Sequence, residues 1–404
     1  MFQFCQTDWL FNIIVPNIAF RYLCAKLIIV PGIYIHIPFC KRKCMYCDFY
    51  SVARSDKTDE FIDALLLEAE MQNDYFGESN IDTLYMGGGS PGILNSYQIH
   101  RIFQGLSNTF DLSQIKECTV ELNPEDALPG YLEMLKKNGV NRISIGVQST
   151  HNQYLGLLGR RHSGTEALQA IYNAKQAGFS NISADIMFGI PQLSLGELTE
   201  TIDKLAESGI NHISAYLLTA EGKTLLVRQI AGKQIVLPDD ETCRQQYNVL
   251  CNASKAHGFD HYEISNFCIP GTHSRHNSAY WNGSAYLGLG PSAHSYNGQK
   301  TRRANISDLK MYIEKIRTGK TTYCEENLSE TDLINEYIMT RLRTVSGIDV
   351  GEFERNFGTL AFRHLLNTSK MRLQQGLLVQ NGNRIFISEH HMLISDTIIS
   401  DLFQ

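Results

Sequence analysis

Three cysteines stand close together near the start of the chain and are well suited to bind a metal. Cys40, Cys44 and Cys47 occur in the segment CKRKCMYC, whereas the other seven of the ten cysteines are scattered. Closely spaced thiolates on one loop can share a soft metal centre. A structural zinc site usually has four protein ligands, and the sequence contains no second Cys-x2-Cys pair. Three ligands leave one coordination position open, which is typical of a reactive centre, whereas His36 or Asp48 as a fourth ligand would complete a zinc site.

Glycines and polar side chains recur downstream, each at the end of a short β-rich segment. The segment MGGGSPG, residues 86–92, has three glycines whose backbone can approach a ligand closely, and it matches neither the dinucleotide nor the phosphate-loop spacing. The other polar residues at such positions are Glu121, Gln148, Arg160 and Asp185. Each alone is also typical of a turn or a cap. Together they offer donors and acceptors that suit a ribose, an amino group and a carboxylate.

Alternating strands and helices must position these residues. Strands are expected at 32–37, 81–86, 117–122, 142–147, 181–186 and 212–217, and helices between them at 58–75, 130–138, 164–177 and 196–208. Gly139, Gly178 and Gly209 follow the last three helices, and a glycine in the left-handed conformation commonly terminates a helix. The succession predicts an α/β fold with a parallel sheet, a partial (β/α)6 TIM-like barrel. Active sites of such barrels lie at the carboxyl ends of the strands, where the residues above fall.

Three parts are expected along the chain. Residues 1–31 are interpreted as an extension outside the main fold, 32–300 as the barrel, and 301–404 as a smaller, mostly helical C-terminal domain. In the last part, 329–344 and 358–375 have helical patterns, and Asn381-Gly382 predicts the turn of a β-hairpin, followed by a final helix.

Composition limits the class of protein. Hydrophobic types make up 43% of the 404 residues, which excludes disordered and collagen-like classes, and a net charge of −6 provides no overall field for binding nucleic acid. No window approaches eighteen uncharged apolar residues, so we expect no transmembrane helix. Dilute cysteines and the lack of a signal-peptide pattern indicate the reducing cytoplasm. Peripheral membrane association through residues 1–31 is the alternative.

The cysteine loop after the first expected strand resembles that of the radical S-adenosylmethionine superfamily. The resemblance implies a [4Fe–4S] cluster on Cys40, Cys44 and Cys47, with S-adenosylmethionine chelating the fourth iron. Tyr46 matches an aromatic residue that packs on the adenine. The spacing from Tyr34 to Asp185 is similar to that of the oxygen-independent coproporphyrinogen III oxidase-like family, although Ser90 stands where threonine is more usual. The cofactor contacts that this match implies are Tyr34, Gly88, Gly89, Ser90, Glu121, Gln148, Arg160 and Asp185.

Two families with this barrel imply different functions. The oxidase pattern extends to C-x3-C-x2-C-x-C, but Phe49 stands at the fourth cysteine position of this chain. The segment HNSAYW, residues 276–281, resembles the HNxxYW element associated with heme binding in HemW-like heme chaperones. This resemblance implies that His276 is an axial ligand of heme iron, that Tyr280 and Trp281 cover the macrocycle, and that heme passes to acceptor apo-hemoproteins. Oxidative decarboxylation of coproporphyrinogen III is the alternative, so whether the chain is an enzyme stays open.

Other interpretations of the HNSAYW segment also stay open. His276 is compatible with a histidine that has only a structural role, and Trp281 with packing between the barrel and the C-terminal domain. Cys268 and His273 are alternative iron ligands. The sequence therefore predicts a radical S-adenosylmethionine barrel that binds and transfers heme and does not bind nucleic acid.

Overall fold

One large sheet organises most of the chain. The computed structural model describes residues 31–53, 56–77 and 79–404. The sheet has twelve strands in the order β14-β13-β12-β11-β1-β4-β5-β6-β7-β8-β10-β9. The strands from β11 to β8 in this order pair in parallel, and the outer strands on both sides pair antiparallel. The arrangement confirms the predicted α/β partial barrel.

All six strands expected from the sequence are present in this sheet. The six expected strands are β1 (Gly32–Ile37), β4 (Thr83–Gly88), β5 (Glu117–Leu122), β6 (Arg142–Gln148), β7 (Asn181–Phe188) and β8 (His212–Leu217). The other six strands of the sheet are β9 (Asp260–Glu263), β10 (Asn266–Cys268), β11 (Tyr286–Leu289), β12 (His294–Tyr296), β13 (Thr301–Asn305) and β14 (Tyr323–Asn327). Two further short strands, β2 (Phe39–Cys40) and β3 (Val52–Ala53), pair with each other at the two ends of the cysteine loop. β4 lies two residues further along the chain than expected, so Gly87 and Gly88 are part of the strand.

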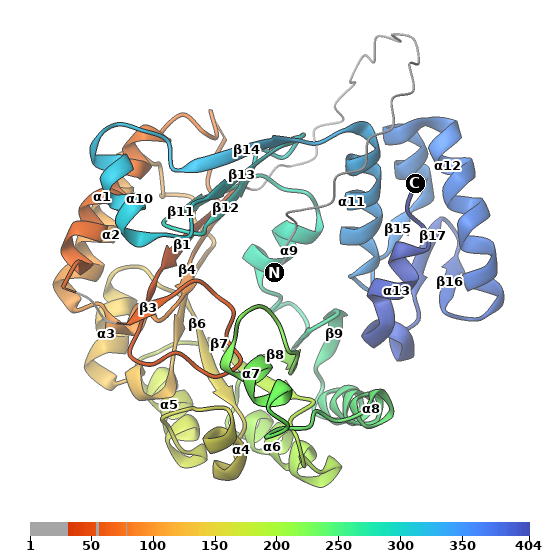
Figure 1. The fold of residues 1–404 in the computed structure, drawn as a ribbon, viewed down its shortest axis with the longest axis horizontal. Helices are drawn as coiled ribbons and strands as arrows, with labels where there is room; N and C mark the ends of the chain where they lie inside the picture. The colour runs from red at the N-terminus through yellow and green to blue at the C-terminus, as the bar shows by residue number, and fades with distance from the viewer. Residues whose placement is uncertain (1–30, 54–55, 78) are drawn as a thin grey trace.

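Helices cover the outer side of the barrel strands (Figure 1). They are α1 (Thr58–Met71), α2 (Ser96–Thr109), α3 (Pro129–Lys137), α5 (Gly164–Gln176), α6 (Leu195–Glu207) and α8 (Asp240–Ala256). The short helices α4 (Asn152–Leu157) and α7 (Leu225–Ala231) lie in the loops after β6 and β8, next to the cysteine loop, where the Leu226 backbone N–H donates to the Met45 carbonyl. Capping boxes at Asn95, Ser163 and Ser194 fix the starts of α2, α5 and α6. Gly139, Gly178 and Gly209 have φ of 89°, 85° and 81°, so these three are left-handed stop residues as predicted.

The C-terminal part follows the last strands of the large sheet. Its elements are α11 (Glu330–Leu342), β15 (Ile348–Asp349), α12 (Val350–Gln374), β16 (Leu378–Asn381), β17 (Arg384–Ile387) and α13 (Ser395–Ser400). Two further helices precede it, α9 (Arg275–Trp281) before β11 and α10 (Leu309–Arg317) between β13 and β14. The predicted hairpin is formed by β16 and β17, which pair with β15 in a separate small sheet. A domain boundary after residue 300 stays a prediction, and the large sheet itself continues through β14.

The helix expected at 358–375 begins earlier, at Val350. Asp349 caps it by accepting a hydrogen bond from the backbone of Glu352, and Gly358, with φ of 81° and ψ of 170°, kinks it. The kink interrupts the apolar periodicity, which is why the sequence pattern indicated only the second half.

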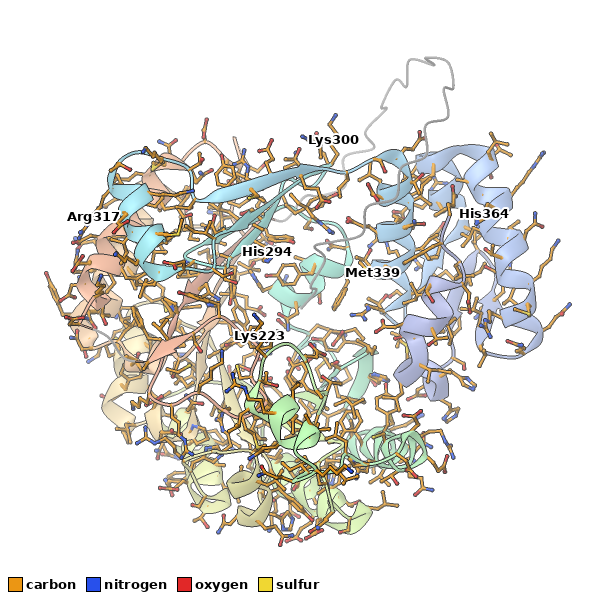
Figure 2. All side chains as sticks on the ribbon, in the orientation of Figure 1. Lys223, His294, Lys300, Arg317, Met339 and His364 are labelled. Atoms are coloured by element: carbon orange, nitrogen blue, oxygen red, sulfur yellow. The ribbon has the colours of Figure 1, made fainter. Side chains whose placement is uncertain are left out.

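Figure 2 shows side chains around all of the helices and strands, and a continuous apolar core links the strands with the outer helices and the C-terminal elements. No helix within the described residues is long and apolar enough to cross a membrane. The predicted N-terminal extension, residues 1–31, lies outside the described residues except for Pro31.

Candidate functional site

The three predicted cluster ligands lie on one loop at the carboxyl end of β1. Cys40 ends β2, and Cys44 and Cys47 follow in the loop that returns to β3, with a hydrogen bond of 3.3 Å from Cys47 N to Cys44 O. All three thiols are free and half-buried, and burial raises the pKa of Cys47 to about 11. Within the described residues, no three metal-binding side chains converge into a ready metal site.

A network of buried polar side chains ties this loop to the barrel. Lys41 forms an ion pair with Asp126, which is buried in the 3-10 turn after β5. The Ser90 hydroxyl donates to Asp126 Oδ2 (3.1 Å) and accepts from Asn123 Nδ2 (3.0 Å). Ser90, predicted as a cofactor contact, is thus 2% exposed and directs its hydroxyl into the protein.

Arg160 lies beside the cysteine loop. Its Nη1 is 3.4 Å from Cys44 Sγ, and its Nη2 donates to Asn123 Oδ1 (2.7 Å) and to the carbonyl oxygen of Gly146 (2.8 Å). A fixed positive charge at this distance favours an iron-bound thiolate and also suits the carboxylate of a ligand.

Glu121 faces the glycine segment at the end of β4. Its Oε1 accepts from the Tyr85 hydroxyl (2.6 Å) and its Oε2 from the backbone of Gly88 (3.2 Å). Burial raises the pKa of Glu121 to about 7, and the neighbouring Asp185 adds to the shift. A Cβ atom at Gly87 would lie 2.6 Å from the Glu121 carboxyl group, so glycine is required there for this contact.

Asp185 and Gln148 complete the polar group at this end of the barrel. Asp185 Oδ1 accepts from Ser144 (3.0 Å), and burial raises its pKa. Gln148 has φ of 64° at an irregularity of β6, a conformation that is strained for a residue with a side chain. Such strain is concentrated at functional sites. Tyr34 lies deeper in β1, with its hydroxyl 3.1 Å from His36 Nδ1.

The residues predicted to bind heme lie at the other end of the strands. His276, in α9, is hydrogen-bonded through Nδ1 to Thr83 Oγ1 (2.8 Å), and its backbone N–H donates to Glu117 Oε1 (3.0 Å). Thr83 and Glu117 are the first residues of β4 and β5, so α9 closes the amino ends of the strands. The other ring nitrogen, Nε2, is 3.0 Å from the Tyr280 hydroxyl. Burial lowers the pKa of His276 to about 3.

Tyr280 and Trp281 pack between the barrel and the C-terminal helices. The Tyr280 ring is edge-on to His276, with centroids 5.2 Å apart, and edge-on to Tyr286 at 4.8 Å. The Trp281 carbonyl accepts from Arg341 of α11 (3.1 Å), and the Arg343 guanidinium lies 5.9 Å from the indole centroid. This packing agrees with the interpretation that Trp281 packs between the barrel and the C-terminal domain. It does not test whether Trp281 also covers a heme macrocycle.

The two alternative iron ligands differ in exposure, since His273 is exposed and Cys268 is not. Cys268 is fully buried in β10. His273 packs edge-on against Tyr262, with centroids 4.6 Å apart.

Comparisons with known proteins identify the family. Residues 34–221 match the model of the radical SAM superfamily, and residues 328–394 match that of the HemN C-terminal domain. The chain is 32% identical over 370 residues to the heme chaperone HemW of Bacillus subtilis, covering 90% of this chain and 97% of the relative. It is 31% identical to the heme chaperone HemW of Mycobacterium tuberculosis, covering 92% and 94%. The chain belongs to the HemW family of radical S-adenosylmethionine proteins.

The HemW-family chain also has the fold of a solved structure. Coproporphyrinogen III oxidase (HemN) from Escherichia coli superposes with a TM-score of 0.81 at 22% identity, covering 93% of this chain and 90% of HemN. At that identity the likeness establishes the fold alone.

Membership of the radical SAM superfamily implies a [4Fe–4S] cluster and S-adenosylmethionine as cofactors, as predicted. The donor set fits them, because three free thiols lie on one loop at the carboxyl ends of the strands, with Arg160 beside them. The assignment of individual residues to the cofactors stays a prediction.

Several residues of the site were not predicted. Asn123 and Asp126 organise the cysteine loop, Tyr85 holds Glu121, and Glu117 holds α9. The segment ELNPED carries two of them directly after a predicted strand. The alternation along β4 and β5 also points Tyr85 and Glu117 into the barrel.

Proposed function

We propose that this chain is a heme chaperone that binds heme and transfers it to acceptor apo-hemoproteins. The observation that carries the proposal is the similarity to heme chaperones over nearly the whole length of both chains. Phe49, at the position of the fourth cysteine of the oxidase pattern, supports it. The reducing cytoplasm is the proposed compartment, since the described cysteines are all free thiols.

Cys40, Cys44 and Cys47 are the proposed ligands of the [4Fe–4S] cluster, which supplies a site for chelating S-adenosylmethionine. Arg160, Glu121 and Asp185 provide charged groups around that position. The remaining proposed contacts to the cofactor are Tyr34, Tyr46, Gly88, Gly89, Ser90 and Gln148.

His276 is the proposed ligand of heme iron, with Tyr280 and Trp281 beside the macrocycle. The ring is neutral because its pKa is low, and a neutral imidazole can ligate iron. Its Nε2 is hydrogen-bonded to the Tyr280 hydroxyl, so ligation requires Tyr280 to move away. Heme binding at this motif is therefore coupled to a rearrangement of α9.

A heme titration of the full chain followed by absorbance tests the proposal. The wild type is expected to bind heme, and His276→Ala is expected to weaken binding and to change the spectrum. His257→Ala, at an exposed histidine paired with Asp203, is the matched control and should leave both unchanged. An unchanged affinity and spectrum in His276→Ala would remove the ligand assignment.

A second assay separates the chaperone from the oxidase. The reconstituted protein is incubated anaerobically with S-adenosylmethionine, a reductant and coproporphyrinogen III. The chaperone proposal expects no protoporphyrinogen IX, and its formation would overturn the proposal in favour of an oxidase.

A further inference from the structure

Arg142 is a buried arginine whose side chain is incompletely paired. It begins β6 and is 1% exposed. Its Nε has no hydrogen-bond partner, and none of the ion pairs within the described residues involves it. Burying an unpaired charge is costly, since neither water nor a counter-charge stabilises it. Such a residue is expected where a ligand supplies the counter-charge.

The alternation of side chains along β6 directs Arg142 into the barrel. Residues two apart on a strand share a face, so Arg142 points to the same side as Ser144, whose hydroxyl binds Asp185. Arg142 therefore lies on the inner face, one inward position below the polar group that is proposed to hold S-adenosylmethionine.

The register neighbours of Arg142 are also unsatisfied. Its Cα partners are Thr119 on β5 and Asn181 on β7, and paired residues of a sheet share a face. Thr119 Oγ1 and Asn181 Oδ1 are both buried without a hydrogen-bond partner. Three adjacent strands thus each leave a polar atom unpaired at one level of the barrel, which indicates a ligand position.

The acidic residues nearby are already engaged. Glu117 accepts from the backbone N–H groups of Arg275 and His276, Glu121 from Tyr85 and Gly88, and Asp185 from Ser144. Burial is the main cause of the lowered pKa of His276 and of the raised pKa of Glu121, and the Arg142 charge makes a smaller downward contribution to both. Glu121 and Asp185 therefore act on the Arg142 charge through space, but neither forms an ion pair with its guanidinium, so the guanidinium can still receive a carboxylate.

We propose that Arg142, with Thr119, binds a carboxylate inside the barrel, and that this carboxylate is a propionate of the tetrapyrrole cargo. The guanidinium fork matches a carboxylate, and the Thr119 hydroxyl can donate to the same group. The assignment of the carboxylate to the cargo rests on the proposed heme-chaperone function. The existence of the anion site does not depend on that proposed function.

The anion site is tested first without any tetrapyrrole. Sodium propionate is compared with sodium chloride at equal ionic strength in thermal unfolding of the full chain. Propionate is expected to raise the Tm of the wild type but not that of Arg142→Met. Arg142→Met removes an unpaired buried charge, so without propionate it should melt at or above the wild-type temperature. Equal effects of propionate on both proteins would overturn the site.

The cargo assignment is tested with iron-free protoporphyrin IX and its dimethyl ester, followed by porphyrin fluorescence. Without iron, His276 ligation does not contribute. The wild type is expected to bind the free acid at least about tenfold more tightly than the ester, since a charged hydrogen bond contributes about 1.5–3 kcal/mol and 1.4 kcal/mol is tenfold. Arg142→Met should lose this preference and Arg142→Lys should keep part of it.

Arg244→Met is the matched control, because it removes the same charge at an exposed residue that pairs with Glu241. It should keep the wild-type preference for the free acid. A wild type that binds acid and ester equally, while still binding heme, would overturn the cargo assignment and leave the chaperone proposal standing. A loss of S-adenosylmethionine affinity in Arg142→Met would instead assign the carboxylate to that cofactor.

Discussion

The Nη1 atom of Arg160 lies 3.4 Å from the Sγ atom of Cys44. The two residues are 116 positions apart in the chain, and Nη2 of the same guanidinium also binds Asn123 Oδ1 and the Gly146 carbonyl. One side chain thus connects the cysteine loop, the turn after β5 and strand β6. This places a fixed positive charge at the point where the cluster and S-adenosylmethionine are expected to meet.

Arg160→Met is therefore expected to weaken S-adenosylmethionine binding by about 10- to 100-fold, because a hydrogen bond to a charged group contributes about 1.5–3 kcal/mol. Anaerobic calorimetry on the iron-reconstituted protein measures the affinity. The neighbouring Arg161 is exposed, so Arg161→Met is the control and should bind as the wild type does. Equal affinities of the two variants would exclude Arg160 as a cofactor contact.

Glu121 predicts a pH dependence of cofactor binding. Burial raises its pKa to about 7, so the side chain is largely protonated at pH 6 and largely ionised at pH 8. The ionised form is the stronger acceptor at both oxygens, whereas the protonated form uses one of them as a donor. S-adenosylmethionine affinity should therefore increase from pH 6 to pH 8 in the wild type, and Glu121→Gln should flatten this increase. A variant with the wild-type slope would show that another group titrates.

The six barrel strands could be predicted because each is a short segment rich in β-branched and aromatic residues, which depends on local sequence alone. Glu121 lies at the carboxyl end of β5 as expected, whereas β7 continues to Phe188, three residues past Asp185. Strands β13 (TRRAN) and β14 (YCEEN) could not be found, because their sequences are polar and only pairing with a neighbour makes them strands.

The position of the HNSAYW segment could not be read from the sequence either. His276 meets Thr83, 193 residues away, only because α9 packs against the first residues of β4 and β5. A motif match gives residue types and spacing, whereas the end of the barrel at which the motif lies depends on the tertiary fold. The sequence also does not show that the Arg142 Nε atom lacks a hydrogen-bond partner, because that depends on which groups surround it in the fold.

Gly87→Ala tests the close contact between β4 and Glu121. The added Cβ would lie 2.6 Å from the Glu121 carboxyl group, which must move and lose its bond from Gly88 N. We expect S-adenosylmethionine binding to fall by about tenfold, the equivalent of about 1.4 kcal/mol. Gly196→Ala, in α6 with no atom within 4 Å of the new methyl group, is the control and should bind normally. Normal binding by Gly87→Ala would separate Glu121 from cofactor recognition.

Tyr280→Phe distinguishes an iron-ligating His276 from a structural one. The change removes the hydroxyl 3.0 Å from Nε2 and keeps the ring. If Nε2 ligates iron, loss of a competing hydrogen bond of about 1 kcal/mol should tighten heme binding by about fivefold. Tyr172→Phe, at a tyrosine that is 56% exposed, should have no effect in the same titration. Unchanged affinity in Tyr280→Phe would mean that Nε2 stays bonded within α9 when heme is present.

The buried His276 also predicts how stability changes with pH. Burial lowers its pKa to about 3 in the folded chain, against about 6.5 in the unfolded chain. Between these values the unfolded chain binds an extra proton, so the free energy of unfolding falls as pH falls below 6.5. From pH 7 to pH 5 the contribution of His276 to this loss is about 2 kcal/mol, at about 1.4 kcal/mol per pH unit.

Urea unfolding of the wild type and of His276→Leu at pH 7 and pH 5 measures this contribution. His36 and His212 also have lowered pKa values owing to burial, but they are present in both proteins, so their effect cancels in the difference. His276→Leu should be less stable than the wild type at pH 7, because Thr83 and Tyr280 lose their shared partner. Between pH 7 and pH 5, the free energy of unfolding of His276→Leu should fall by about 2 kcal/mol less than that of the wild type. The same pH dependence in both proteins would show that His276 gains its proton in the folded chain, which requires α9 to open without heme.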